Sequence, residues 1–167
     1  MPNSYTDVVN QAISLLDDLS NNEYQTLITP HFASSIGAHI RHIIDHFLAL
    51  QDGLAKGHIN YNVRHRHNQT EKFVDIAVQA LHDINQWLSN LDEAICQQTI
   101  LVTSEIDISH TKSSTCSSTL ERELVFVSSH AIHHYALIRI MCSMQNISVP
   151  DFFGYAPATI THINRSA

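Results

Sequence analysis

Residues 35–57, SIGAHIRHIIDHFLALQDGLAKG, carry the pattern that decides the fold. At about 100° per residue, His39, His42 and His46 fall on one arc of a helix together with aliphatic residues. Ser34 or Ser35 suits the N-cap of such a helix, and Gly57 suits a left-handed C-cap. The pattern therefore predicts a helix over 36–56 whose core-facing side contains three imidazoles. Arg41 and Asp45 lie on the opposite side, where we expect them to meet solvent.

A second stretch has the same character. Ser118-Thr-Leu-Glu121 has the spacing of a capping box and predicts a long helix that continues to about Met144. Its core-facing arc again has imidazoles where aliphatic residues are expected: His130, His133 and His134. Burying a polar ring without a partner costs about 1–3 kcal/mol, so several such rings need a common reason.

The remaining segments are mainly helical. Apolar residues at three- and four-residue steps predict helices over about 5–19 and, capped by Thr70, up to about Leu91. Four further expectations are a short helical segment after a capping box at 20–23, a polar loop over 58–69, a short hairpin or ordered loop within 95–117, and an apolar tail over 149–163 that packs on the body. Together these predict an all-α fold, an antiparallel four-helix bundle in a single domain over 1–167.

Composition excludes several classes of function. The chain has 167 residues, a net charge of −7 and 13 histidines, so it lacks the basic face that nucleic-acid binding requires. No apolar run exceeds four residues, and the first ten residues show no secretory pattern, so we expect no membrane span and a cytoplasmic location. Three widely spaced cysteines fit reduced thiols. Cys142 is interpreted as a small buried hydrophobe.

A metal ion would explain the inward histidines. His130 and His134 are four residues apart on a helix, so both rings can point at one ion. A third ring from the facing helix would complete the set, and His42 is the best placed, with His39 and His46 about one turn away on either side. Three imidazoles suit Zn, Ni, Fe and Cu alike. The alternative is a bundle without metal whose histidines are only hydrogen-bonded.

The other histidines are expected to be structural or solvated. His58, His65 and His67 form a small basic patch with Arg64 and Arg66, which we interpret as a solvated loop. His31, His82, His110 and His162 are interpreted as surface or packing residues. The sequence contains no GxSxG, P-loop, HExxH or dinucleotide-binding signature.

Two motifs carry a resemblance to a known family. Ser35-Ile-Gly-Ala-His-Ile-Arg-His42-Ile-Ile-Asp-His46 and His130-Ala-Ile-His-His134-Tyr135 resemble the second- and fourth-helix motifs of DinB-like (YfiT-like) metal-binding bundle proteins. The likeness extends loosely over nearly the whole chain, including STLEREL at 118–124. One departure is Tyr135-Ala136-Leu137, where many members have Arg-Gly-Gln, so contacts made by that tripeptide are not carried over.

The resemblance implies a four-helix bundle in up-down-down-up order that forms a homodimer. It also implies a divalent ion held by His42, His130 and His134. Some relatives are S-transferases or isomerases that use low-molecular-weight thiols. We therefore expect a metal-dependent transferase or hydrolase acting on a small molecule, with His39, His46 and His133 supporting the ligands or moving protons. The alternative is a non-catalytic bundle with a structural metal or a small-ligand site.

Overall fold

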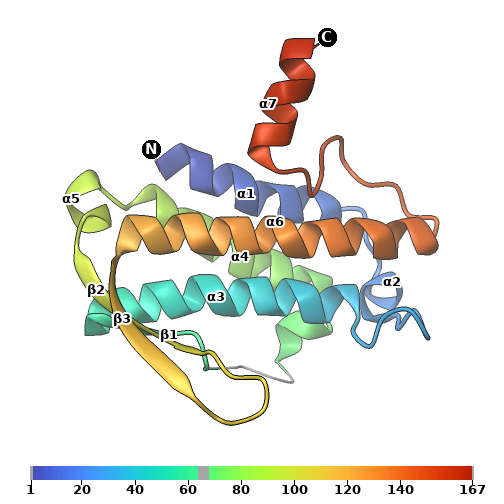
Figure 1. The fold of residues 1–167 in the computed structure, drawn as a ribbon. Coiled ribbons are helices and arrows are strands. Elements are labelled where there is room, and N and C mark those ends of the chain that lie inside the picture. Colours follow the sequence, from blue (N-terminus) through green and yellow to red (C-terminus); the bar gives the residue numbers. More distant parts are fainter. Residues whose placement is uncertain (1, 64–67, 167) are drawn as a thin grey trace.

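Four long helices lie side by side and form the body of the molecule (Figure 1). The computed structural model describes residues 2–63 and 68–166. The long helices are α1 (Pro2–Leu16), α3 (Ile36–Lys56), α4 (Val74–Ser89) and α6 (Leu120–Met144). Both α3 and α1 pack against α4 and α6, so the four helices form a bundle. α1 and α6 run in one direction and α3 and α4 in the other, which is the up-down-down-up order (Figure 1).

Shorter elements connect these helices. The helical ones are α2 (Asn21–Gln25), the 3₁₀ turn η1 (Gln69–Glu71), α5 (Glu93–Cys96) and α7 (Pro157–Ser166). The strands are β1 (His58–Asn60), β2 (Thr99–Glu105) and β3 (Ser113–Thr119). None of the helices in the described part of the chain is both long and apolar enough to cross a membrane.

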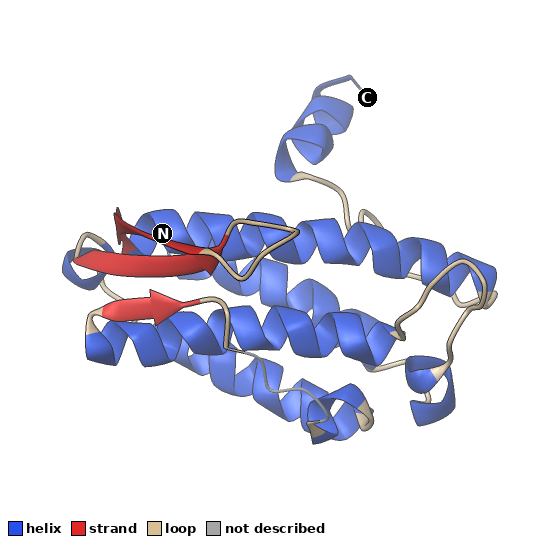
Figure 2. Ribbon diagram, turned by 60° about the horizontal axis from the view of Figure 1, so that its bottom comes forward, coloured by secondary structure: helices blue, strands red, loops and turns tan. Residues whose placement is uncertain are grey.

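The strands form a small mixed sheet on one side of the bundle (Figure 2). β2 and β3 are an antiparallel hairpin with Val102 opposite Cys116, in the segment where a hairpin or an ordered loop was expected. β1 pairs with β2 in parallel, with Ile59 opposite Val102, inside the segment that was predicted to be a loop. The all-α prediction is therefore wrong in this respect, since the bundle carries a three-stranded sheet.

Two glycines at the end of α3 allow β1 to form. Gly57 ends the helix in the left-handed region at φ 69°, as predicted, and turns the chain back over α3. Gly53 lies directly under the strand, where a Cβ would be 2.8 Å from the Cα of Ile59. Ile59 is fully buried at this contact. Burial of this side chain, together with pairing to β2, makes a strand of a segment that is polar overall.

Besides Gly57, the helix ends agree with the sequence at three points and differ at two. The capping box of Ser20 and Glu23, the cap by Ser35 and the end of α6 at Met144 are all present. Thr70 instead lies within η1, and the first N–H of α4 is bound by Asn21 Oδ1 at 2.8 Å. The N-cap of α6 is Thr119, because the side chain of Ser118 donates to Glu123.

The outer side of α3 is covered rather than solvated. Asp45 is only 4% exposed, and the Arg41 side chain lies 3.5 Å from Glu71 in an ion pair with 13% of its surface exposed. The prediction that both residues meet solvent is therefore wrong. α3 is contacted by η1 and β1 as well as by its bundle neighbours, and these connecting segments cover the side that the helical arc left outside.

The C-terminal tail divides into a packed part and an exposed part. Phe153 is fully buried, and its ring centroid lies 5.0 Å from that of Tyr135. It anchors the tail on α6 as expected. α7 buries none of its residues and projects away from the bundle (Figures 1 and 2). The prediction that the tail packs on the body therefore holds only for its first half.

Candidate metal centre

Five imidazole rings form a cluster between α3 and α6, and we call the space that these rings occupy the groove. The rings belong to His39, His42 and His46 of α3 and to His130 and His134 of α6. Neighbouring ring centroids are 4.4–5.1 Å apart. One ring, that of His46, is buried, and the other four are half-buried. The two arcs of histidine predicted from helical periodicity therefore meet across one groove.

Two ring nitrogens approach one point, the Nε2 atom of His130. The Nε2 atom of His130 lies 3.0 Å from Nε2 of His42 and 3.2 Å from Nε2 of His134. In tetrahedral zinc sites, metal–nitrogen distances of about 2.0–2.1 Å place two ligating nitrogens about 3.3 Å apart. These two spacings are compatible with a shared ion, and His42, His130 and His134 are the residues that the sequence motifs selected.

His46 brings a fourth nitrogen within reach of the same point. The ligand atoms of His42, His46 and His130 all lie within 4.8 Å of one another. Nδ1 of His46 is 2.9 Å from the carbonyl oxygen of His42, which can only accept, so Nδ1 carries the proton. In the neutral ring, Nε2 then has the lone pair that a metal ligand requires. The sequence placed His46 beside the ligands, whereas the geometry puts it among the candidate ligands.

His39 and His133 lie farther from this point. The Nδ1 atom of His39 is 2.8 Å from Nδ1 of His134, and its Nε2 atom is 3.0 Å from the hydroxyl of Ser34. His133 is exposed, with its ring centroid 5.5 Å from that of His134, so the prediction that it lies on the core-facing side of the helix is wrong. His39 is thus joined to the cluster by a hydrogen bond, and His133 only borders it.

The surroundings favour neutral rings. Burial lowers the pKa of His39, with a smaller contribution from His133. Burial, followed by the neighbouring imidazoles, lowers the pKa of His134 to about 3. A metal ligand must be a neutral imidazole, so the groove holds His134 in the form that binds metal.

Two aromatic side chains lie against the histidine cluster beside His46 and His130, and a carboxylate binds one of them. The ring of Tyr61 stacks on that of His46 with 5.3 Å between the ring centroids. The ring of Phe126 stacks on that of His130 with 5.9 Å between the centroids. The hydroxyl of Tyr61 donates to Glu123 at 2.8 Å, and burial is the main cause that raises its pKa. Glu123 is 1% exposed and also accepts hydrogen bonds from Ser118 and Arg122.

Sequence analysis did not identify Tyr61 or Glu123. The signal for Glu123 is its place on the inward arc of α6, beside the buried Leu124 and Val127. A carboxylate on such an arc indicates bound partners, because a buried charge needs them. Nothing local distinguishes Tyr61, since its burial depends on β1.

The other histidines lie away from the groove. His31, His82, His110 and His162 are exposed, in agreement with their interpretation as surface residues. Of the basic patch, His58 is exposed and its Nε2 is 2.7 Å from the hydroxyl of Thr103, while residues 64–67 lie outside the described part of the chain. Cys142 is fully buried, and burial raises its pKa to about 11, as suits an unreactive thiol.

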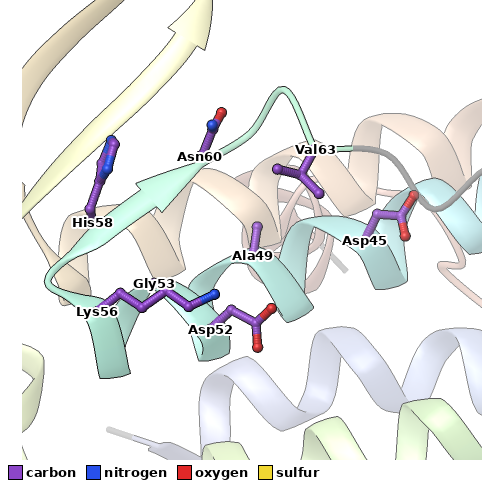
Figure 3. A pocket seen from close by; sticks show the side chains of 8 residues that line it. All are labelled: Asp45, Ala49, Asp52, Gly53, Lys56, His58, Asn60 and Val63. Atoms are coloured by element: carbon purple, nitrogen blue, oxygen red, sulfur yellow. The ribbon is translucent and has the colours of Figure 1, made fainter.

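A cavity of about 380 Å³ lies between α3 and β1. Figure 3 shows the side chain of Lys56 extending along α3 toward Asp52, with His58 and Asn60 pointing away from the helix. Asp45 lines its other end. None of the five histidines of the cluster lines this cavity, so it is separate from the candidate metal centre.

Of the comparisons with known proteins, the one with solved structures agrees with the fold. No family model matches the chain. FK506-binding protein 5 of Rhizopus delemar is 32% identical over 107 residues, which is 64% of this chain and only 28% of that protein. The crystal structure of a DinB-like protein from Bacillus subtilis, YjoA, superimposes with a TM-score of 0.65 at 16% identity, over 91% of this chain and 96% of the other. The likeness predicted from the two histidine motifs is thus confirmed for the architecture, and this chain has the fold of a DinB-like protein.

Proposed function

We propose that this chain is a member of the DinB-like family that binds a divalent metal ion between α3 and α6. The proposed ligands are Nε2 of His42, His130 and His134. The observation that supports them is the approach of two Nε2 atoms to that of His130, at 3.0 and 3.2 Å. Three imidazoles are compatible with Zn, Ni or Fe and do not choose among them.

The proposed activity is transfer or isomerisation with a low-molecular-weight thiol, or hydrolysis of a small molecule. When bound, the ion would supply Lewis acidity toward a thiol or a water. The residues of the chain would hold that ion and shape the space around it, with Tyr61 and Phe126 as apolar walls. The thiol rests on the resemblance to DinB-like proteins. The proposal includes a cytoplasmic location and excludes nucleic-acid and membrane partners.

A second function is a structural or ligand-binding metal site without catalysis. His46 favours it, because the ligand atoms of His42, His46 and His130 lie within 4.8 Å of one another. Four imidazole ligands would complete a tetrahedral set and leave no position for a substrate, whereas three leave one open. The number of protein ligands therefore separates the two functions.

Two further parts of the proposal concern the whole chain. Residues 1–167 would form one domain, and two copies would form a homodimer. The dimer rests on the family resemblance. Sedimentation velocity over a range of protein concentrations tests it, and a monomer at high micromolar concentration would remove this part of the proposal without affecting the metal site.

Metal analysis of the purified protein and its variants tests the ligands. Replacing His42, His130 or His134 with Ala should lower metal affinity by about 10-fold or more, since changes beyond the ligands already cost about that much. His82→Ala, on the exposed side of α4, is the matched control and should bind as the parent does. Loss of metal in the control but not in His130→Ala would show that the assignment is wrong.

The same proteins decide between the two functions. Co²⁺-loaded parent and His46→Ala proteins should have the same visible spectrum if His46 is not a ligand. Thiol transfer to a panel of electrophiles and hydrolysis of activated esters are then measured on the loaded parent protein. An altered spectrum in His46→Ala with no activity on any compound would favour the non-catalytic function.

A further inference from the structure

We infer that His39 is a positioning residue that sets the tautomer of His134 through a hydrogen-bonded chain from His134 to His39 to Ser34. This inference rests on the metal site proposed above. The chain consists of two contacts, Nδ1 of His134 to Nδ1 of His39 at 2.8 Å and Nε2 of His39 to Oγ of Ser34 at 3.0 Å.

The two nitrogens of the His134 ring face different neighbours. Its Nε2 atom lies 3.2 Å from Nε2 of His130, on the side where the proposed ligands converge. Its Nδ1 atom contacts His39 instead. His39 therefore approaches the ring by the nitrogen that the ion does not use, which is the place of a residue that orients a ligand.

The two contacts fix where the protons lie when Nε2 of His134 binds an ion. To bind an ion, Nε2 of His134 must present a lone pair, so the proton of the neutral ring is on Nδ1. Nδ1 of His134 then donates to Nδ1 of His39, which must accept. The proton of His39 is consequently on Nε2, where it donates to the hydroxyl oxygen of Ser34. Each assignment follows from the one before it.

The opposite direction of the hydrogen-bonded chain is incompatible with a bound ion. If Nδ1 of His39 were the donor, the proton of His134 would be on Nε2 and would point toward His130. That arrangement satisfies the hydrogen bonds of the metal-free protein. It also places a proton on Nε2 of His134, the atom that must present a lone pair to an ion. A hydroxyl can both donate and accept, so Ser34 accommodates either direction. His39 thereby couples metal binding to the direction of the chain.

The N-cap of α3 holds the backbone of His39 in place for its contacts with His134 and Ser34. It lies in the first turn of α3, where Ser35 accepts a hydrogen bond from the N–H of Ala38 and its carbonyl accepts one from the N–H of His39. The cap fixes the backbone that carries both Ser34 and His39. The ring of His39 is half-buried, with its centroid 5.1 Å from that of His134.

Three substitutions at one position test the inference. His39→Ala removes the acceptor and should weaken Co²⁺ binding by about 10–100-fold, as the loss of other supporting contacts does. His39→Asn places an amide oxygen near the position of Nδ1 and should restore most of the affinity. His39→Gln places its amide near Nε2 and should not restore it. His82→Ala, an exposed histidine of α4, is the control.

A second readout does not require metal. Two-bond ¹⁵N–¹H correlation spectra report which nitrogen of His134 is protonated in the metal-free protein. The spectrum of His134 should change in His39→Ala and remain close to that of the parent in His39→Asn. Equal spectra and equal affinities in all three variants, or rescue by Gln rather than Asn, would overturn the inference. If the parent takes up no metal, the proposed function fails, while the tautomer of His134 still supports or overturns its coupling to His39.

Discussion

The α1–α4 pair and the α3–α6 pair of the bundle have different kinds of side chain between their helices. α1 and α4 meet through fully buried aliphatic side chains, among them Val9, Leu16, Leu81 and Leu88. α3 and α6 have the same kind of core on their inner sides but fill the groove between them with five imidazoles. Apolar residues at those positions would stabilise the fold more, since a polar ring loses hydration on burial. The difference indicates that the α3–α6 side is organised for binding and the α1–α4 side for stability.

The largest expected effect tests the aliphatic side. Leu81→Ala should lower the free energy of unfolding by about 2–5 kcal/mol, because the side chain is fully buried and leaves a cavity. Ile76→Ala on the same helix, at a site 39% exposed, should cost less than about 1 kcal/mol. Urea unfolding of both variants measures the difference. The metal affinity of folded Leu81→Ala should equal that of the parent, and a loss as large as that in His130→Ala would mean that the two sides are not separable.

A smaller effect tests how the sheet is held to the histidine side. Glu123→Gln removes the charge that receives hydrogen bonds from Tyr61, Ser118 and Arg122. We expect a loss of about 1–3 kcal/mol in the free energy of unfolding, since these donors become poorly satisfied in a buried place. Glu105→Gln, at an exposed position of β2, is the control. Equal urea midpoints for the two variants would contradict a structural role for Glu123.

The smallest effect concerns pH. The pKa of His134 is lowered to about 3, below the value near 6.5 in unfolded chains, so unfolding takes up a proton. The contribution of this ring to stability is therefore complete above about pH 6.5 and is lost as the pH falls toward 3. Because the ring is only half-buried, we expect a loss on the order of 1 kcal/mol between pH 7 and pH 5.

A bound ion should make this dependence steeper, because it also holds its other ligands in the neutral form. Melting temperatures from pH 8 to pH 5, with and without a chelator, measure both slopes. His134→Gln should flatten the slope of the chelated protein, whereas His82→Ala should not. Parallel curves for the metal-loaded and chelated samples, or a metal effect that grows as the pH falls, would contradict a three-histidine site.

Local signals were sufficient for the histidine arcs and for several helix ends. Helical spacing alone places His39, His42 and His46 on one side, because side chains three to four residues apart share a face. The cap by Ser35 and the end at Gly57 are also local, since each depends on neighbours within one turn. The fold of the long helices and the five clustered rings could be predicted for this reason.

Distant contacts decided what could not be predicted. The strand at Ile59 exists because it pairs with Val102, 43 residues later. The start of α4 is fixed by Asn21, 53 residues earlier, and not by the nearby Thr70. Asp45 is buried on the side of α3 that helical periodicity assigned to solvent. Each of these depends on pairing or packing between segments that no local pattern connects.

Gly53 determines how closely β1 packs on α3. A single hydrogen atom stands where any other residue would place a carbon 2.8 Å from the Cα of Ile59. β1 therefore packs directly on the helix. Tyr61, which directly follows the strand, lies against His46. A position two turns along the helix from His46 thus acts as a spacer for the groove. A larger residue there would lift Tyr61 and open the site without altering any of its histidines.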